Sequence, residues 1–302
     1  MTQPGFGRQA SYSPTGDQNR TVRMFASDLD GTLVRSDGTV SDRTRAALKA
    51  AAGAGLIVAF ATGRPPRWLH EIGDATGHTG VAVSANGAVI YDLETETVLR
   101  AHQLAPPLLA EITSGLRAVF PAVRFGVEYG LNFGYEPGYR HDWEISPTHD
   151  RRGNPIEPPL VADLAEIISR PGVKLLAKHR ELDPDTFRAQ ASRLLDGRAT
   201  VTGSSTTALL EIAPPGVTKA TGLAEIAATH GIGPDEVAAI GDMPNDVPML
   251  QWAGRAYAVA NAHPSVLAVV DEVLPSNDDD GVATLIEALL TARADHPAPP
   301  AL

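Results

Sequence analysis

Two carboxylates stand two positions apart directly after a short apolar run. Asp28 and Asp30 flank Leu29, and the preceding run, residues 22–26, is typical of a buried strand. Residues two apart in an extended chain point the same way, so both carboxylates are expected to face one site, and Gly31 allows a sharp turn away from it. Taken alone, the pattern also fits a solvated turn, because Asp and Gly are ordinary turn residues. Its meaning therefore depends on which other polar groups join it.

A second polar motif follows the next apolar run, residues 56–61. Thr62 and Gly63 lie where this predicted strand ends and a helix is expected to begin, a place where a hydroxyl and free backbone N–H groups suit an anion. By itself Thr62 could equally be a helix cap or a turn residue.

Two further motifs lie near the other end of the chain. Lys219 begins a predicted helix over 218–230 and could neutralise a phosphate oxygen, although an isolated lysine is usually a surface residue. After the predicted strand 237–240, Asp242 and Asp246 add two carboxylates in a loop that could also serve only to cap a helix.

Together the four motifs predict a phosphoryl-transfer site. Four converging carboxylates repel one another unless a cation lies among them, and hard oxygen ligands without Cys or His point to Mg²⁺. Lys219 and Thr62 would hold the phosphate oxygens, one carboxylate would attack phosphorus, and a second would protonate the leaving alcohol and then activate water.

The elements expected to position these groups predict an α/β fold. Apolar strands over 22–26, 56–61, 81–84, 237–240 and 256–259 alternate with helices such as 39–54, for which Ser41 is a plausible N-cap. Such alternation is typical of a parallel sheet covered by helices on both faces, as in Rossmann-like cores. Ligands bind such sheets beyond the carboxyl ends of the strands, which is where the polar motifs lie.

The chain divides into two predicted domains. Residues 21–88 and 203–292 carry the strand and helix alternation, whereas 89–202 is richer in aromatic residues and hairpin-like strands, which suggests an inserted α+β domain. Residues 1–20 and 293–302 have the composition of flexible tails.

Charge and composition limit the partners. Acidic residues outnumber basic ones by 36 to 25, for a formal net charge of -11, so nucleic acid and anionic membranes are not expected partners. The sequence has no cysteine and no apolar stretch of membrane-spanning length, which favours a cytoplasmic protein. The oligomeric state stays open.

With these motifs the sequence resembles the haloacid dehalogenase-like hydrolases, and within them the Cof-like group of sugar and cofactor phosphatases. Asn86-Gly87-Ala88 is a further shared landmark. The resemblance implies that Asp28 is the nucleophile and that Asp30 is the acid/base. It also implies that phosphate is bound by Thr62, Gly63, Lys219 and Asn245, and the metal by Asp28, Asp30 (through its backbone carbonyl), Asp242 and Asp246.

The spacing of the motifs indicates the type of cap. About thirty residues separate Asp30 from Thr62, whereas more than 150 separate Thr62 from Lys219, so the cap must be the large α+β kind inserted after the second motif. The function expected is therefore a Mg²⁺-dependent phosphatase that acts on a small phosphorylated metabolite through an aspartyl phosphate. The alternatives are a phosphosugar mutase, which the cap position disfavours, and a catalytically silent ligand-binding member, which would be expected to lack one of the key residues.

The inserted domain should contact the leaving group, and several of its polar and aromatic residues are candidates, although each is also explained as domain core or solvated surface. These candidates, with one from the second motif, are Arg64, Tyr129, Asn132, Tyr135, His141, Trp143, Arg151 and Lys178.

Overall fold

A computed structural model describes residues 21–139, 157–203 and 207–295. An eight-stranded sheet lies at its centre, in the order β14-β13-β12-β1-β2-β3-β4-β5. Its strands are β1 (Met24–Ser27), β2 (Ile57–Ala61), β3 (Val81–Ser84), β4 (Val89–Asp92), β5 (Thr97–Ala101), β12 (Val237–Gly241), β13 (Arg255–Val259) and β14 (Glu272–Leu274).

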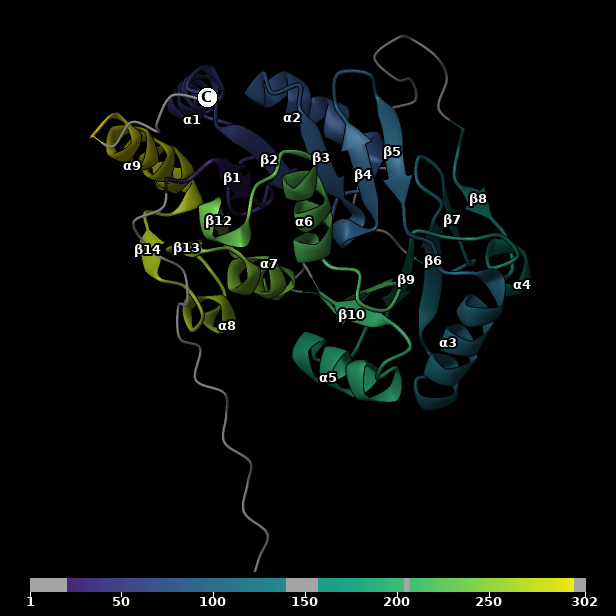
Figure 1. Cartoon of the computed structure of the whole chain (residues 1–302). Helices are drawn as coiled ribbons and strands as arrows, with labels where there is room; N and C mark the ends of the chain where they lie inside the picture. Colours follow the sequence, from purple (N-terminus) through teal and green to yellow (C-terminus); the bar gives the residue numbers. More distant parts are fainter. Residues whose placement is uncertain (1–20, 140–156, 204–206, 296–302) are drawn as a thin grey trace, which may run out of the picture.

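The six strands from β14 to β3 are parallel, and helices cover both faces of the sheet (Figure 1). α1, α2 and α9 pack together on one face, and α6 and α7 pack together on the other. The bounds are α1 (Asp42–Gly53), α2 (Leu69–Thr76), α6 (Lys219–Thr229), α7 (Val247–Trp252), α8 (Pro264–Leu267) and α9 (Gly281–Asp295). Ser41 caps α1 as predicted, since its side chain accepts a hydrogen bond from the N–H of Thr44.

A second sheet of six strands has the order β10-β11-β9-β6-β7-β8 and is mainly antiparallel. Its strands are β6 (Arg124–Glu128), β7 (Phe133–Tyr135), β8 (Leu160–Val161), β9 (Lys174–Lys178), β10 (Thr200–Thr202) and β11 (Leu209–Ala213). Its helices are α3 (Pro106–Val119), α4 (Leu164–Ile167) and α5 (Pro184–Leu194). The predicted fold class, a parallel-sheet core with an inserted α+β unit, is confirmed.

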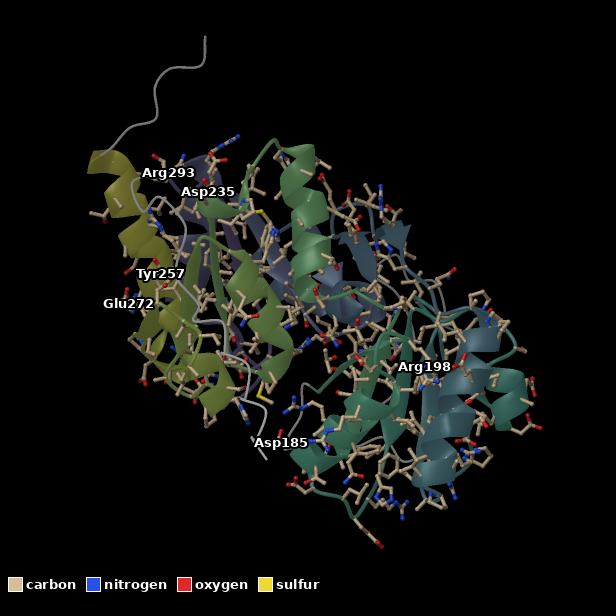
Figure 2. All side chains as sticks on the ribbon, turned by 60° about the horizontal axis from the view of Figure 1, so that its bottom comes forward. Asp185, Arg198, Asp235, Tyr257, Glu272 and Arg293 are labelled. Atoms are coloured by element: carbon tan, nitrogen blue, oxygen red, sulfur yellow. The ribbon has the colours of Figure 1, made fainter. Side chains whose placement is uncertain are left out.

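Each sheet has its own hydrophobic core. The larger sheet buries residues such as Phe25 and Phe60 against its helices. One face of the smaller sheet packs on α3 and α5, where Phe125 and Phe187 are fully buried. We call the unit around the larger sheet the core unit and the unit around the smaller sheet the cap. Figure 2 shows Asp185 of α5 where the cap approaches the core unit, and His263 Nε2 lies 4.0 Å from its carboxylate.

The limits of the smaller sheet differ from the predicted insert, 89–202. β4 and β5 form an antiparallel hairpin that extends the larger sheet beyond β3, and β11 pairs with β9 and β10 in the smaller sheet. By strand pairing the cap therefore begins after Ala101 and ends at Ala213. A hairpin looks the same in sequence whichever sheet it joins, and here the antiparallel pairing of β4 with β3, in which Ser84 lies opposite Val89, decides its membership.

Among the described residues, no helix is both long and apolar enough to cross a membrane. The cytoplasmic location stays a prediction.

His78 introduces a pH dependence into the stability of the core unit. Its ring packs against Phe60, and no described residue forms a hydrogen bond with its buried Nε2. Burial lowers the pKa of His78 to about 4 from an ordinary value of 6.5. Between these values the unfolded chain holds a proton that the folded chain does not, so folding stability falls as the pH is lowered through this window.

Replacement of His78 by leucine should remove this contribution, which amounts to at most roughly 3 kcal/mol. Urea unfolding at several pH values would measure it as the difference between the two proteins, so that the titration of other groups cancels. The difference should be constant above about pH 7 and should change in favour of the variant as the pH falls toward 4. The same difference at every pH would contradict the assignment.

Candidate active site

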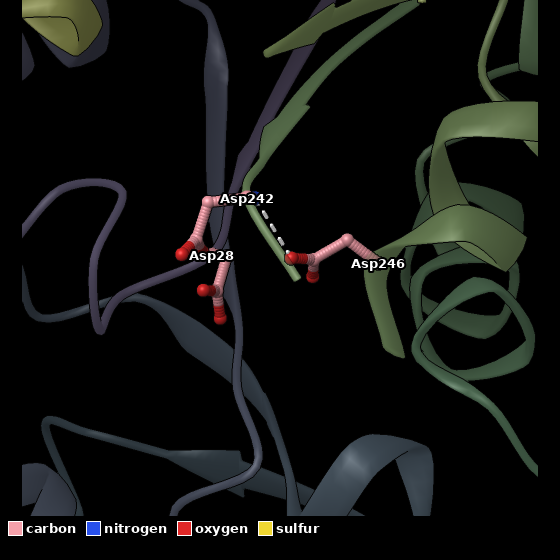
Figure 3. A group of neighbouring side chains, drawn as sticks. All are labelled: Asp28, Asp242 and Asp246. Atoms are coloured by element: carbon pink, nitrogen blue, oxygen red, sulfur yellow. Dashed lines mark hydrogen bonds between the residues drawn. The ribbon is translucent and has the colours of Figure 1, made fainter. Parts of the chain in front are cut away.

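Three buried carboxylates meet at the carboxyl ends of β1 and β12. Asp28 directly follows β1, and its N–H continues the parallel pairing by donating to the carbonyl of Ile240 at 3.0 Å. Asp242 directly follows β12, and Asp246 closes the next turn. Carboxylate oxygens of the three residues lie within 4.8 Å of one another, and Figure 3 shows Asp28 and Asp242 side by side with Asp246 opposite.

Lys219 joins two of these carboxylates. It begins α6, and its Nζ lies 2.6 Å from Asp28 Oδ1 and 2.6 Å from Asp246 Oδ1, with its side chain fully buried. Thr218 holds the start of the helix in place, because its side chain accepts from the N–H of Thr221. Burial alone would lower the pKa of Lys219, but the carboxylates of Asp246 and Asp28 raise it above its ordinary value. The ammonium group therefore stays charged.

The loop after β12 orients its own carboxylates. The N–H groups of Asp242 and Met243 donate to Asp246 Oδ2 at 3.0 and 2.9 Å, and the first of these bonds is the dashed line in Figure 3. One oxygen of Asp246 thus fixes the loop and the other binds Lys219. Thr32 Oγ1 donates to Asp242 Oδ1 at 2.8 Å. A side chain at Gly31, which has a φ of +79°, would place its Cβ 2.5 Å from Asp242 Oδ2, so the turn after Asp30 requires glycine.

Burial and repulsion between the carboxylates disfavour the ionised forms of Asp28 and Asp242. Burial and the charge of Asp246 raise the pKa of Asp28 well above its ordinary value, although Lys219 opposes the shift. Burial and Asp246 likewise raise the pKa of Asp242 to about 6. Lys219 supplies one positive charge for three carboxylates. A bound divalent cation would balance the remainder, and three converging carboxylate oxygens suit a hard cation such as Mg²⁺.

Asp30 takes a different place from Asp28. Its side chain is 57% exposed and lies outside the buried cluster. There Arg64 donates from Nε to Asp30 Oδ2 at 2.8 Å and from Nη2 to Asp30 Oδ1 at 2.5 Å. Extended alternation does not relate Asp28 to Asp30, because β1 ends at Ser27 and the N–H groups of residues 32–34 turn back to the carbonyl of Leu29. Asp30 and Asp28 still line the same cavity.

This cavity has a volume of about 270 Å³ and lies between the core unit and the cap. Thr62 and Gly63 follow β2 on the core side, as predicted, and Thr62 Oγ1 accepts from the N–H of Arg64 at 3.0 Å, which leaves the hydroxyl hydrogen available to a ligand. Asn245 also lines the cavity. Its Nδ2 donates to Asn86 Oδ1 at 3.0 Å, and its buried Oδ1 accepts from no described residue.

The cap contributes residues to this cavity that the sequence did not predict: Glu128, Lys174, Leu176, Thr207, Leu209 and Glu211. A signal was present, since Glu211 is the single charge in the otherwise apolar run of β11. A charge in such a run is unexpected unless it has a buried partner or a function. The sequence could not show which partner that is.

Four of the cap residues that were candidates for contact with the leaving group do not line this cavity. Tyr129 donates to the carbonyl of Ile167, Asn132 donates to Glu157, and Tyr135 stacks on Phe133. Lys178 lines a separate hollow of the cap. Arg64 does line the main cavity. His141, Trp143 and Arg151 fall outside the described residues.

Comparisons with known proteins identify the family of this chain. The sequence profile of the haloacid dehalogenase-like hydrolases matches residues 25–286. The chain therefore belongs to this family of hydrolases, and the family predicted from the sequence is confirmed.

Several relatives and solved structures are similar over most of this chain. The 5-amino-6-(5-phospho-D-ribitylamino)uracil phosphatase YitU of Bacillus subtilis is 27% identical over 274 residues, which cover 87% of this chain and 96% of YitU. A protein of Arabidopsis thaliana named endoribonuclease YBEY, chloroplastic, is 28% identical over 86% of this chain, but the match spans only 45% of that relative. The crystal structure of SMU.1108c from Streptococcus mutans superposes with a TM-score of 0.77 at 23% identity, over 90% of this chain and 100% of that one.

The ion pairs of Lys219 predict a large effect on stability. Lys219→Met keeps most of the unbranched side chain but leaves Asp28 and Asp246 buried without their shared cation. The loss should destabilise the folded chain by about 3–5 kcal/mol, the usual cost of breaking a buried ion pair from one side. Urea unfolding in the presence of a chelator would measure it. Lys49→Met, on the exposed surface of α1, is the matched control and should change stability by less than about 0.5 kcal/mol. Equal effects of the two changes would contradict the central role of Lys219.

Proposed function

We propose that this chain is a Mg²⁺-dependent phosphatase that hydrolyses a small phosphate monoester through an aspartyl phosphate at Asp28. One observation carries the proposal: Lys219 forms buried ion pairs with Asp28 and Asp246, and Asp28 lines a cavity together with Thr62 and Gly63. A carboxylate, a fixed ammonium group and a hydroxyl donor around one point suit a transferring phosphoryl group.

In the first half of the reaction Asp28 is the nucleophile. Lys219 occupies its Oδ1, so the other oxygen attacks phosphorus and the bond from phosphorus to the leaving oxygen breaks. Lys219 and Thr62 stabilise the charge on the phosphoryl oxygens. Mg²⁺, held by Asp28, Asp242, Asp246 and the backbone carbonyl of Asp30, would supply further positive charge to the phosphoryl group.

Asp30 is the acid/base of both halves. It protonates the leaving alcohol and then takes a proton from the water that attacks the aspartyl phosphate, which releases inorganic phosphate and restores Asp28. Its exposed position at the cavity wall is compatible with this exchange, and the ion pair with Arg64 holds the carboxyl group in place. Asn245 is the remaining residue of the proposed phosphate-binding set.

The cap would cover the leaving group and exclude bulk water. The cavity volume of about 270 Å³ suits a small metabolite rather than a polymer. YitU acts on a phosphorylated ribityl compound, according to its name, which supports a small phosphorylated metabolite as the substrate class.

The covalent mechanism predicts the loss of turnover in Asp28→Asn, a change that keeps the side-chain volume and removes the nucleophile. Phosphate release from a panel of phosphosugars, nucleotides and vitamin phosphates would be measured with Mg²⁺ and with chelator. The wild type should release phosphate from at least one compound only with Mg²⁺, and Asp28→Asn should be at least about 10³-fold slower.

Asp196→Asn, at an exposed position, is the matched control and should behave as the wild type. Asp30→Asn should be severely slowed and should accumulate a phosphorylated protein after acid quench. Retained turnover in Asp28→Asn would rule out the covalent mechanism, and the absence of release from every compound would contradict the phosphatase activity itself.

Metal binding should depend on pH with a definite sign. The raised pKa values of Asp28 and Asp242, about 6 for Asp242, mean that Mg²⁺ must displace protons at acidic pH. The affinity for Mg²⁺ should therefore rise from about pH 5 to about pH 7, with proton release at the lower end. Calorimetry in buffers of different ionisation enthalpy would measure both quantities. Asp242→Asn should abolish binding, whereas Asp278→Asn, on an exposed loop, should not. An affinity independent of pH would contradict the assignment.

A further inference from the structure

Charged side chains form a buried row on the face of the cap sheet that meets the core unit. Glu128 of β6 and Lys174 of β9 are cross-strand partners, and Glu211 of β11 pairs with Leu176, two residues along the same face. The side chains of Glu128, Lys174 and Glu211 are only 2–5% exposed. Buried charges are costly unless they are paired, so this row requires an explanation.

Two residues of this row, Glu128 and Lys174, contact the core unit in different ways. Glu128 forms a buried ion pair with Arg67, from the single turn Pro66–Trp68 of the core unit. Lys174 Nζ donates to Glu211 Oε1 at 2.6 Å and, across the interface, to the carbonyl oxygen of Gly63 at 2.7 Å. The first contact joins two side chains, whereas the second reaches the backbone of the loop that follows Thr62.

In the loop after β2, the cap binds the backbone at the carbonyl of Gly63, through Lys174. On its two sides the core unit holds the backbone: the N–H of Asn86 donates to the carbonyl of Thr62 at 2.9 Å, and the N–H of Ala85 donates to the carbonyl of Arg64 at 2.9 Å. Glu211 packs closely over the same residue, since a Cβ on Gly63 would lie 3.3 Å from Glu211 Oε1. Glycine at 63 therefore lets the cap carboxylate approach the loop.

The peptide that Lys174 holds also orients the hydroxyl of Thr62. The carbonyl of Gly63 and the N–H of Arg64 belong to one planar peptide unit, and this N–H donates to Thr62 Oγ1 at 3.0 Å. An ammonium group on the carbonyl fixes the plane of the unit and polarises its N–H. The Thr62 oxygen is thereby used as an acceptor, so its hydroxyl hydrogen is left to donate to a ligand in the cavity that Thr62 lines.

We propose that Lys174 is a positioning residue of the phosphate-binding loop: from the cap it fixes the 63–64 peptide, which orients the Thr62 hydroxyl toward the phosphoryl group. Phosphate binding then depends on the cap being closed, because opening would remove Lys174 from the Gly63 carbonyl. Glu211 holds Lys174 in place. The inference rests on the proposed phosphatase function and adds to it a cap residue that acts through Thr62.

The first test compares Lys174→Met with Lys178→Met, four residues along the same face of β9 and outside the main cavity. Lys174→Met should lower kcat/KM for a small monoester such as p-nitrophenyl phosphate by about 10–100-fold, the range expected when a binding group is misplaced. The affinity for inorganic phosphate with Mg²⁺, measured by calorimetry, should fall in parallel. Lys178→Met should leave both within about twofold.

A double-mutant cycle separates positioning from damage to the fold. If Lys174 acts through Thr62, then Lys174→Met should have little further effect in a Thr62→Val background, because the oriented hydroxyl is already absent. The variant Lys174→Met/Glu211→Gln removes the unpaired buried charge, so its thermal stability should recover toward the wild type while its phosphate affinity stays low.

Additive effects of Lys174→Met and Thr62→Val, or recovery of activity together with stability in Lys174→Met/Glu211→Gln, would overturn the proposal. Both outcomes presuppose a wild type that releases phosphate in an Asp28-dependent manner. A wild type that releases none would instead contradict the phosphatase function, so the two failures are distinguishable.

Discussion

The buried contact of Lys219 with Asp28 and Asp246 is the constraint on which the rest of this structure depends. Carboxylates taken out of water repel one another and lose hydration, so they can be gathered only where a cation lies among them. The fold satisfies this by ending β1 and β12 side by side and by starting α6 at the same edge of the sheet. The tightly hydrogen-bonded loop after β12 and the glycine turn after Asp30 follow from the same requirement.

The two units divide the chemistry between them. The parallel sheet presents the groups that are proposed to act on phosphorus, because its strand ends and helix starts converge at one edge. The cap presents a mixed surface of paired charges and the apolar side chains of Leu176 and Leu209. Its ion pair with the core unit between Glu128 and Arg67 is buried, and such pairs contribute little net stability because desolvation offsets their attraction.

Gly63 lies where both units meet. From the core side it follows the threonine proposed to bind phosphate, and from the cap side Lys174 and Glu211 contact its carbonyl and its Cα. Any account of substrate binding therefore has to include the position of the cap. The same contact accounts for Glu211, the single charge of the otherwise apolar β11.

The sequence by itself determined the fold class and identified the groups that are proposed to act in catalysis. Asp28, Thr62, Lys219 and Asp242 each lie at the end of an apolar strand or the start of a helix, and such local patterns predict position without knowledge of the partners. The tertiary structure alone decided three matters: that Asp30 pairs with Arg64 outside the buried cluster, that β4 and β5 extend the larger sheet, and that Lys174 reaches Gly63. The first and the third depend on contacts between residues distant in the chain, and the second depends on which sheet a local hairpin joins. Periodicity and spacing encode neither.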